Sequence, residues 1–262
     1  MPRSARESSL TSCYHVMMRG INKDKIFIEL QYKKFIEELL EKFLKESGVQ
    51  IISFCIMDNH LHLVLKGELG DMSFALKKIN TRFAMRINKE ENRVGHVFQD
   101  RFKSEIIHND QHLLQAIRYV HNNPVKAKIV ANQKDYLWSS YRYFVGSNSG
   151  ILDKDMIEEV LEIAGGIRSF EGFHSTEDFT EFIDTNEEIE NNRLEHAQSI
   201  ITDFCKDKGI VEIGRGNHSE HLDELISIIL SKSNLSHRKI AGLLEVNNNV
   251  VHSISKSLRN EE

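Results

Sequence analysis

Two histidines flank one leucine inside an apolar run, and this pattern constrains the fold more than any other stretch of the chain. The run is Met57-Asp58-Asn59-His60-Leu61-His62-Leu63-Val64-Leu65. Side chains alternate between the two faces of a β-strand, so a strand beginning at His60 directs His60, His62 and Val64 to one face. Two neighbouring imidazoles on a buried face need partners, because burying an unsatisfied polar group costs free energy. The run therefore predicts a strand whose histidines hold a metal or a phosphate, with a purely structural pair as the alternative.

The segments around this run predict an α+β domain, a mostly antiparallel sheet with helices packed on it. Val49–Met57 and the histidine run are strands joined by two residues, which favours an antiparallel hairpin. The other predicted elements are strand 13–19, helix 31–47, a helix capped by Asp71 or Ser73, strand 98–107, and a helix that Asp110 caps and Pro124 ends.

Charge divides the chain into three parts. Residues 1–145 hold 23 Lys and Arg against 16 Asp and Glu, whereas residues 146–215 hold 6 against 17. Residues 216–262 are close to neutral, with 5 against 6. We therefore expect domains at 1–145, 146–215 and 216–262, the first suited to a polyanionic partner. The acidic part is a solvated face, a spacer or a lid over basic surface.

Two helices of the first domain carry candidate functional residues. On the helix that starts at Asp110, Tyr119 lies off the stripe of buried aliphatic residues, and Asn123 follows one turn later. On the helix over residues 71–87, basic side chains share one surface at spacings of three to four residues. That surface is either a solvated face or a ridge that follows DNA phosphates, with Lys77 and Arg82 as candidate contacts.

The C-terminal part has the spacing of a helix-turn-helix. Ser236 precedes a helix with Ile240, Ala241 and Leu244 inward, and a second helix has Val250 and Ile254 inward. Glu245 stands where this turn usually has glycine. A small helical bundle for protein contacts is the alternative. The second helix would present to duplex DNA the residues Asn248, Asn249, His252 and Lys256.

The histidine pair and the tyrosine suggest phosphoryl chemistry. Two neutral imidazoles can chelate a divalent cation if a third ligand approaches from another element. Such a cation polarises a phosphoryl oxygen, and a nearby tyrosine hydroxyl would attack as the nucleophile.

Four motifs occur in a fixed order: Tyr14–Gly20, Met57–Leu65, Gly95–Ser104 and Arg118–Ala127. Together they resemble the single-tyrosine HUH transposases, in particular the REP-associated tyrosine transposase branch of the IS200-like family. HUH denotes His, a hydrophobic residue and His, here His60, Leu61 and His62. The resemblance covers about residues 1–145, and the helix-turn-helix is similar to extensions of some bacterial members.

The resemblance implies a ferredoxin- or RRM-like sheet core, in an enzyme that cuts and rejoins single-stranded DNA near hairpins. It implies that Tyr119 forms a 5′-phosphotyrosine, that His60, His62 and Asn123 bind Mg²⁺ or Mn²⁺, and that the protein is a homodimer. It further implies DNA backbone contacts by Arg19, Arg101 and Lys103. A regulator with a non-catalytic core and a replication-initiator-like nickase are the alternatives.

The expected location is the bacterial cytoplasm, on the nucleoid and not at a membrane. The three cysteines form no CxxC pair, and we expect reduced thiols. No apolar run approaches the roughly 20 residues that span a bilayer.

Overall fold

The fold is described from a computed structural model, which covers residues 9–146, 148–210 and 221–261. It divides into an N-terminal unit, residues 1–183, and a C-terminal unit, residues 184–262. Each unit has its own hydrophobic core. The predicted boundary between residues 215 and 216 lies outside the described residues, and the three-part division stays a prediction. In the described residues no helix is long and apolar enough to cross a membrane.

A four-stranded antiparallel sheet forms the centre of the N-terminal unit and confirms the predicted α+β fold. Its strand order is β2-β3-β1-β4. In the pairing of β3 with its neighbours, His62 lies opposite Met17 on one side and Cys55 on the other. The strands are β1 (Cys13–Arg19), β2 (Gln50–Ile56), β3 (His60–Lys66) and β4 (Lys103–Ile106).

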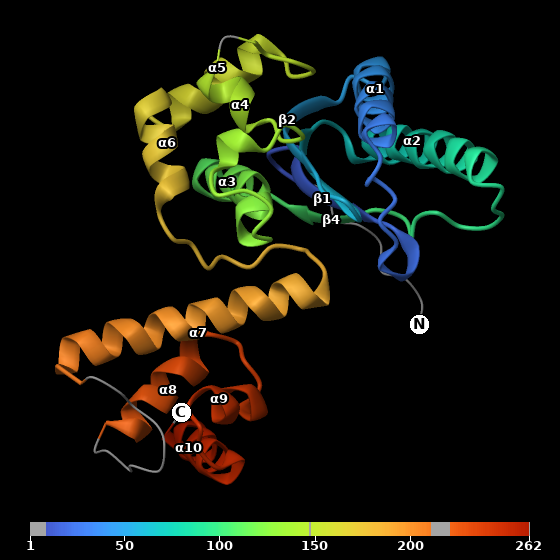
Figure 1. The fold of residues 1–262 in the computed structure, drawn as a ribbon. Helices are drawn as coiled ribbons and strands as arrows, with labels where there is room; N and C mark the ends of the chain where they lie inside the picture. The colour runs from blue at the N-terminus through green and yellow to red at the C-terminus, as the bar shows by residue number, and fades with distance from the viewer. Residues whose placement is uncertain (1–8, 147, 211–220, 262) are drawn as a thin grey trace. The chain divides into compact units, whose positions relative to one another are not determined.

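Helices cover both faces of this sheet. In Figure 1, α1 (Leu30–Glu46) and α2 (Leu69–Glu90) lie on one side and α3 (Asp110–Lys126) on the other. Leu61 and Leu63 of β3 are fully buried, as are His62 and Val64 between them. The strand is therefore buried on both faces, which accounts for its continuous apolar character.

Four predicted boundaries were wrong. The N-cap of α3 is Asn109, whose side chain accepts from the His112 amide, and not Asp110. The α2 helix begins at Leu69, before both predicted caps. Only Lys103–Ile106 of the predicted strand 98–107 pairs as a strand, apart from one bridge between Phe98 and Gly20. The α3 helix runs through Pro124 to Lys126, because proline there removes one N–H while the Ala127 amide still bonds to the Asn123 carbonyl at 2.9 Å.

The segment after residue 145 joins the core of the N-terminal unit. Met156 and Val160 of α5 (Lys154–Ile163) are buried there, as is Phe170 of α6 (Ile167–Ser175). This packing brings the acidic part of the chain next to α3. The remaining short elements are η1 (Ile21–Lys23), η2 (Gln133–Asp135) and α4 (Tyr141–Val145).

The C-terminal unit is helical in the residues that the structure describes. Leu225, Ile226, Ile240 and Val251 form the centre of its core and are fully buried. Its helices are α7 (Asn186–Lys208), α8 (Leu222–Lys232), α9 (His237–Leu243) and α10 (Asn248–Glu261).

Candidate functional site

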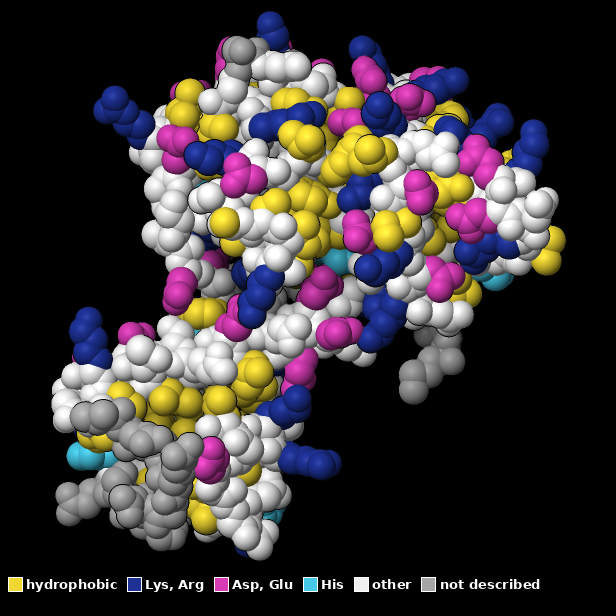
Figure 2. Space-filling view, viewed as in Figure 1, with side chains coloured by type: hydrophobic (Ala, Val, Ile, Leu, Met, Phe, Trp, Pro, Cys, Tyr) yellow, Lys and Arg dark blue, Asp and Glu magenta, His cyan; other side chains and the backbone are white. Residues whose placement is uncertain are grey.

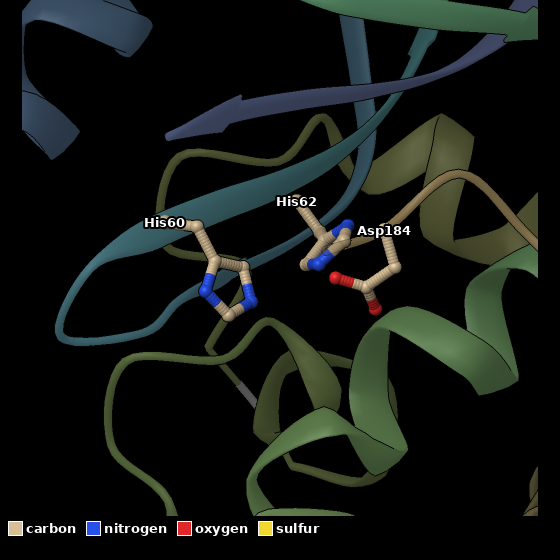
Figure 3. Close-up of side chains that lie close together, drawn as sticks. All are labelled: His60, His62 and Asp184. Atoms are coloured by element: carbon tan, nitrogen blue, oxygen red, sulfur yellow. The ribbon is translucent and has the colours of Figure 1, made fainter. Parts of the chain in front are cut away.

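The two histidines of β3 lie side by side, as predicted. Their ring centroids are 4.8 Å apart with the planes nearly perpendicular, and both side chains are buried. Figure 3 shows both imidazoles projecting from the same strand. The period-two alternation of the strand places both rings on one face.

Hydrogen bonds hold the turn that precedes His60. The Asn59 Oδ1 atom accepts from His60 Nδ1 at 2.7 Å. Buried Lys33 donates to an Asp58 carboxylate oxygen and to the Tyr136 hydroxyl, each at 3.0 Å, and that hydroxyl donates to the Ile56 carbonyl at 2.7 Å. A neutral imidazole that donates through Nδ1 keeps a lone pair on Nε2. The turn therefore leaves Nε2 as the nitrogen of His60 that could hold a metal.

A third buried histidine contacts His62. His15 of β1 lies with Nε2 at 3.0 Å from His62 Nδ1, and its own Nδ1 lies at 2.7 Å from Oε1 of Glu105 on β4. The His15 and His62 rings stack with centroids 5.1 Å apart. Sequence reasoning missed this residue, although the alternation of strand 13–19 and its pairing with the histidine strand could have indicated it.

Tyr119 of α3 lies against these histidines. Its ring centroid is 5.7 Å from those of His62 and His15, in edge contacts. It lies off the aliphatic stripe of α3, as predicted, but only 5% of it is exposed. The Phe182 ring packs on it, with ring centroids 5.0 Å apart. Tyr119 thus lies within reach of the histidine pair and beneath a later segment of the chain.

Phe182 belongs to residues 176–183, here called the strap, and Arg118 of α3 holds this segment in place. Arg118 forms an ion pair with Asp178 and donates to the Thr176 hydroxyl at 2.7 Å. Burial raises the pKa of Asp178, but bonds from Thr180 and the nearby Arg118 outweigh it and hold that pKa below its ordinary value. The strap is therefore attached to α3 by a charged contact next to Tyr119.

Asp184 follows the strap directly in the chain. One ligand atom each of His60, His62 and Asp184 lies within 4.8 Å of the others, and all three side chains are buried. Two imidazoles and a carboxylate suit a divalent transition-metal ion such as Mn²⁺. The sequence contained no signal for Asp184, which lies in an acidic segment outside the four motifs.

Asn123, the predicted third ligand, is buried on α3. Its Nδ2 donates to the Tyr119 carbonyl at 3.2 Å, so part of the amide is bonded to its own helix. Its role as a ligand stays a prediction. His121 bonds elsewhere: its ring nitrogens lie at 2.8 Å from Ser140 Oγ and 3.0 Å from His174 Nε2.

A groove of about 890 Å³ separates α2 from the loop before β4. Lys77 and Arg101, two predicted DNA contacts, line it, and the exposed side chains of Phe74 and Met85 add apolar surface. Arg82 is exposed on α2 but does not line the groove. Arg19 ends β1 opposite His60, and Lys103 begins β4 in an exposed position.

Figure 2 shows basic and acidic side chains interspersed over the visible face of the N-terminal unit. The excess of Lys and Arg therefore does not form one continuous patch on that face. The α10 helix exposes all four residues predicted to read duplex DNA: Asn248, Asn249, His252 and Lys256.

Known proteins match the part of the chain that holds these histidines and Tyr119. The sequence profile described as "Transposase IS200 like" matches residues 8–123. Residues 8–123 are thus similar to the IS200-like transposase family. This confirms the resemblance found in the motifs, and leaves the C-terminal helices outside the match.

One relative in sequence and one solved structure are also similar to this chain. A Haemophilus influenzae protein described as a candidate REP-associated tyrosine transposase is 26% identical over 103 residues, which are 35% of this chain and 58% of that protein. The chain thus spans less than two thirds of that relative's length. A solved REP-associated tyrosine transposase bound to a REP hairpin has the same fold, with a TM-score of 0.52 and 17% identity over 70% of this chain and 95% of that one.

Proposed function

We propose that the protein is a DNA strand transferase that cleaves and rejoins single-stranded DNA through Tyr119. The observation that carries the proposal is the contact of the Tyr119 ring with His62 beside His60, within a segment similar to the IS200-like transposase family. A nucleophile next to a pair of metal-binding imidazoles is the arrangement that phosphodiester cleavage needs. The REP-bound relative supports hairpin DNA as the substrate class.

In the proposed reaction the Tyr119 oxygen attacks the scissile phosphorus. The bond from that oxygen to phosphorus forms, the bond from phosphorus to the 3′-oxygen breaks, and the tyrosine proton passes to the departing 3′-oxygen. The products are a 5′-phosphotyrosine and a free 3′-OH. Attack by a 3′-OH of another strand on the same phosphorus reverses these steps and joins the DNA, because a covalent intermediate conserves the energy of the phosphodiester.

The donor set fits a divalent cation. His60 and His62 would each coordinate through Nε2, since Asn59 and His15 engage their Nδ1 atoms. We propose Asp184 as the third ligand on the strength of its proximity, with Asn123 as the alternative. A bound Mg²⁺ or Mn²⁺ would polarise the scissile phosphate. Mn²⁺ is the better probe, because Mg²⁺ prefers oxygen ligands.

The test is covalent capture of DNA. A labelled single-stranded hairpin with a single-stranded flank, incubated with the protein and Mn²⁺, is expected to give an adduct that survives denaturing electrophoresis. Tyr119→Phe and the double variant His60→Ala, His62→Ala should lose the adduct. Tyr143→Phe, at a buried tyrosine of α4, is the matched control and should keep it. Full adduct yield with Tyr119→Phe would reject Tyr119 as the nucleophile.

A second candidate function concerns the C-terminal unit. The exposed row of polar residues on α10, preceded by α9 and a short turn, supports binding of duplex DNA as a helix-turn-helix. The full chain with Asn249→Ala and Lys256→Ala should then bind duplex DNA more weakly and form the same amount of adduct with hairpins. Unchanged duplex binding favours the helical bundle for protein contacts. The expected homodimer also stays a prediction, which sedimentation velocity with and without hairpin DNA tests.

A further inference from the structure

His15 contacts the candidate metal ligand His62, and Glu105 contacts His15 from behind. Nothing in the proposed reaction requires either residue. Glu105 Oε1 lies 2.7 Å from His15 Nδ1, and His15 Nε2 lies 3.0 Å from His62 Nδ1. His15 is fully buried, as is His62. The three side chains come from β4, β1 and β3, three adjacent strands, so the sheet itself fixes their spacing.

The order of donors along this chain of contacts follows from the carboxylate. An ionised carboxylate only accepts hydrogen bonds, so His15 Nδ1 carries the proton. In a neutral imidazole the other nitrogen then accepts, so His15 Nε2 accepts from His62 Nδ1. His62 in turn keeps its lone pair on Nε2. Both nitrogens of His15 are engaged in this arrangement, which leaves it to orient a ligand and not to act as one.

We infer that His15, held by Glu105, is a positioning residue that fixes His62 in the tautomer and ring orientation able to bind a metal through Nε2. The inference rests on the proposed function, since it assigns a role toward the metal. Hydrogen-bonded partners behind ligating histidines fix the tautomer and commonly change metal affinity 10- to 100-fold when removed. Here the partner is a second imidazole with a carboxylate behind it.

Glu105 has a second contact that bears on the same site. Its Oε1 atom also accepts from the Ile183 amide at 3.0 Å. Ile183 immediately precedes Asp184, so one carboxylate orients a histidine ligand and anchors the backbone before the proposed carboxylate ligand. Loss of Glu105 should therefore weaken metal binding at least as much as loss of His15.

The test compares Mn²⁺ affinity, by calorimetry and Mn²⁺ electron paramagnetic resonance, across variants of the full chain. His15→Phe retains ring packing and loses both hydrogen bonds, and should raise the Kd for Mn²⁺ about 10- to 100-fold. His15→Gln keeps an amide oxygen for His62 and should recover most of the affinity. His112→Phe is the matched control, because His112 stacks on Phe182 with ring centroids 5.4 Å apart and is not among the proposed ligands or their hydrogen-bond partners; it should leave the Kd unchanged.

Nitrogen-15 NMR of the imidazoles gives a readout without metal. In the unsubstituted chain His62 should show a proton on Nδ1, and His15→Phe should shift it toward the Nε2-protonated form. Equal Mn²⁺ affinity of His15→Phe and the unsubstituted chain, with the His62 tautomer unchanged, would overturn the inference while leaving the proposed function standing. An unsubstituted chain that binds no Mn²⁺ and forms no adduct would overturn the proposed function and the metal role of His15 with it.

Discussion

Two pairs of buried histidines differ in what their hydrogen bonds serve. In the pair His15 and His62, a carboxylate and a neighbouring tyrosine surround the rings. In the pair His121 and His174, the outer partners are Ser140 and the Phe170 carbonyl. A carboxylate behind an imidazole makes the far nitrogen a better ligand, and the first pair also adjoins His60 and Tyr119. The first pair is therefore the one proposed for function, and the second joins α6 to α3.

The pair that joins α6 to α3 makes stability depend on pH. Burial lowers the pKa of His174 to about 4. As pH falls from about 6.5 toward 4, the unfolded chain gains a proton that the folded chain does not, so folding loses up to about 3 kcal/mol. His174→Gln should flatten this decline, as measured by urea unfolding at pH 7.5, 6.0 and 5.0. The same slope in both proteins would show that His174 does not titrate on unfolding.

At the scale of elements, residue spacing within one strand or one helix predicted the features that depend on that spacing alone. The alternation of His60, Leu61 and His62 predicted β3 and its shared histidine face, and helical spacing predicted that Tyr119 leaves the aliphatic stripe. The cover over Tyr119 was not predictable, because the strap reaches α3 from more than 50 residues along the chain through Arg118 and Asp178. Asp184 was not predicted either, because it also approaches the histidines from a distant part of the chain.

The turn between α9 and α10 has Glu245 where a helix-turn-helix usually has glycine, and the structure shows how the turn accommodates it. Glu245 adopts a φ of 53°, the left-handed conformation for which glycine is the usual residue at this place. The geometry of the turn is thus kept without the glycine, at a conformational cost of about 1 kcal/mol. The missing glycine therefore does not argue against a helix-turn-helix, whose DNA binding stays a prediction.

The groove beside α2 allows the role of single charges to be measured. Lys77 lines the groove, whereas Lys89 is exposed on the same helix and does not. Lys77→Ala should weaken hairpin binding and lower the slope of log K against log salt by about 1, because one fewer counterion is released. Lys89→Ala should leave both quantities unchanged in a fluorescence-anisotropy titration from 50 to 300 mM salt. Equal effects from the two variants would mean that the groove is not where DNA phosphates lie.

Across the whole molecule, charge and chemistry are divided unevenly along the chain. The proposed nucleophile and both histidines come from the basic part, while the strap that buries Tyr119 comes from the acidic part. Tyr119 and the histidines are buried, and the Phe182 ring of the strap packs on Tyr119. Whether the acidic part is a solvated face, a spacer or a lid over basic surface stays a prediction.

The two separate cores lead to a prediction about cooperativity. Ile36 is fully buried in the core of the N-terminal unit, and Ile226 is fully buried in that of the C-terminal unit. Truncating a buried isoleucine to alanine costs about 2–5 kcal/mol. Since no residue that the structure describes belongs to both cores, each variant should lower only one of two transitions in differential scanning calorimetry. Ile226→Ala should in addition leave adduct formation with hairpin DNA unchanged at a temperature below both transitions, because its core contains neither Tyr119 nor the histidines. A single transition that shifts by the same amount in both variants would show that the units unfold as one.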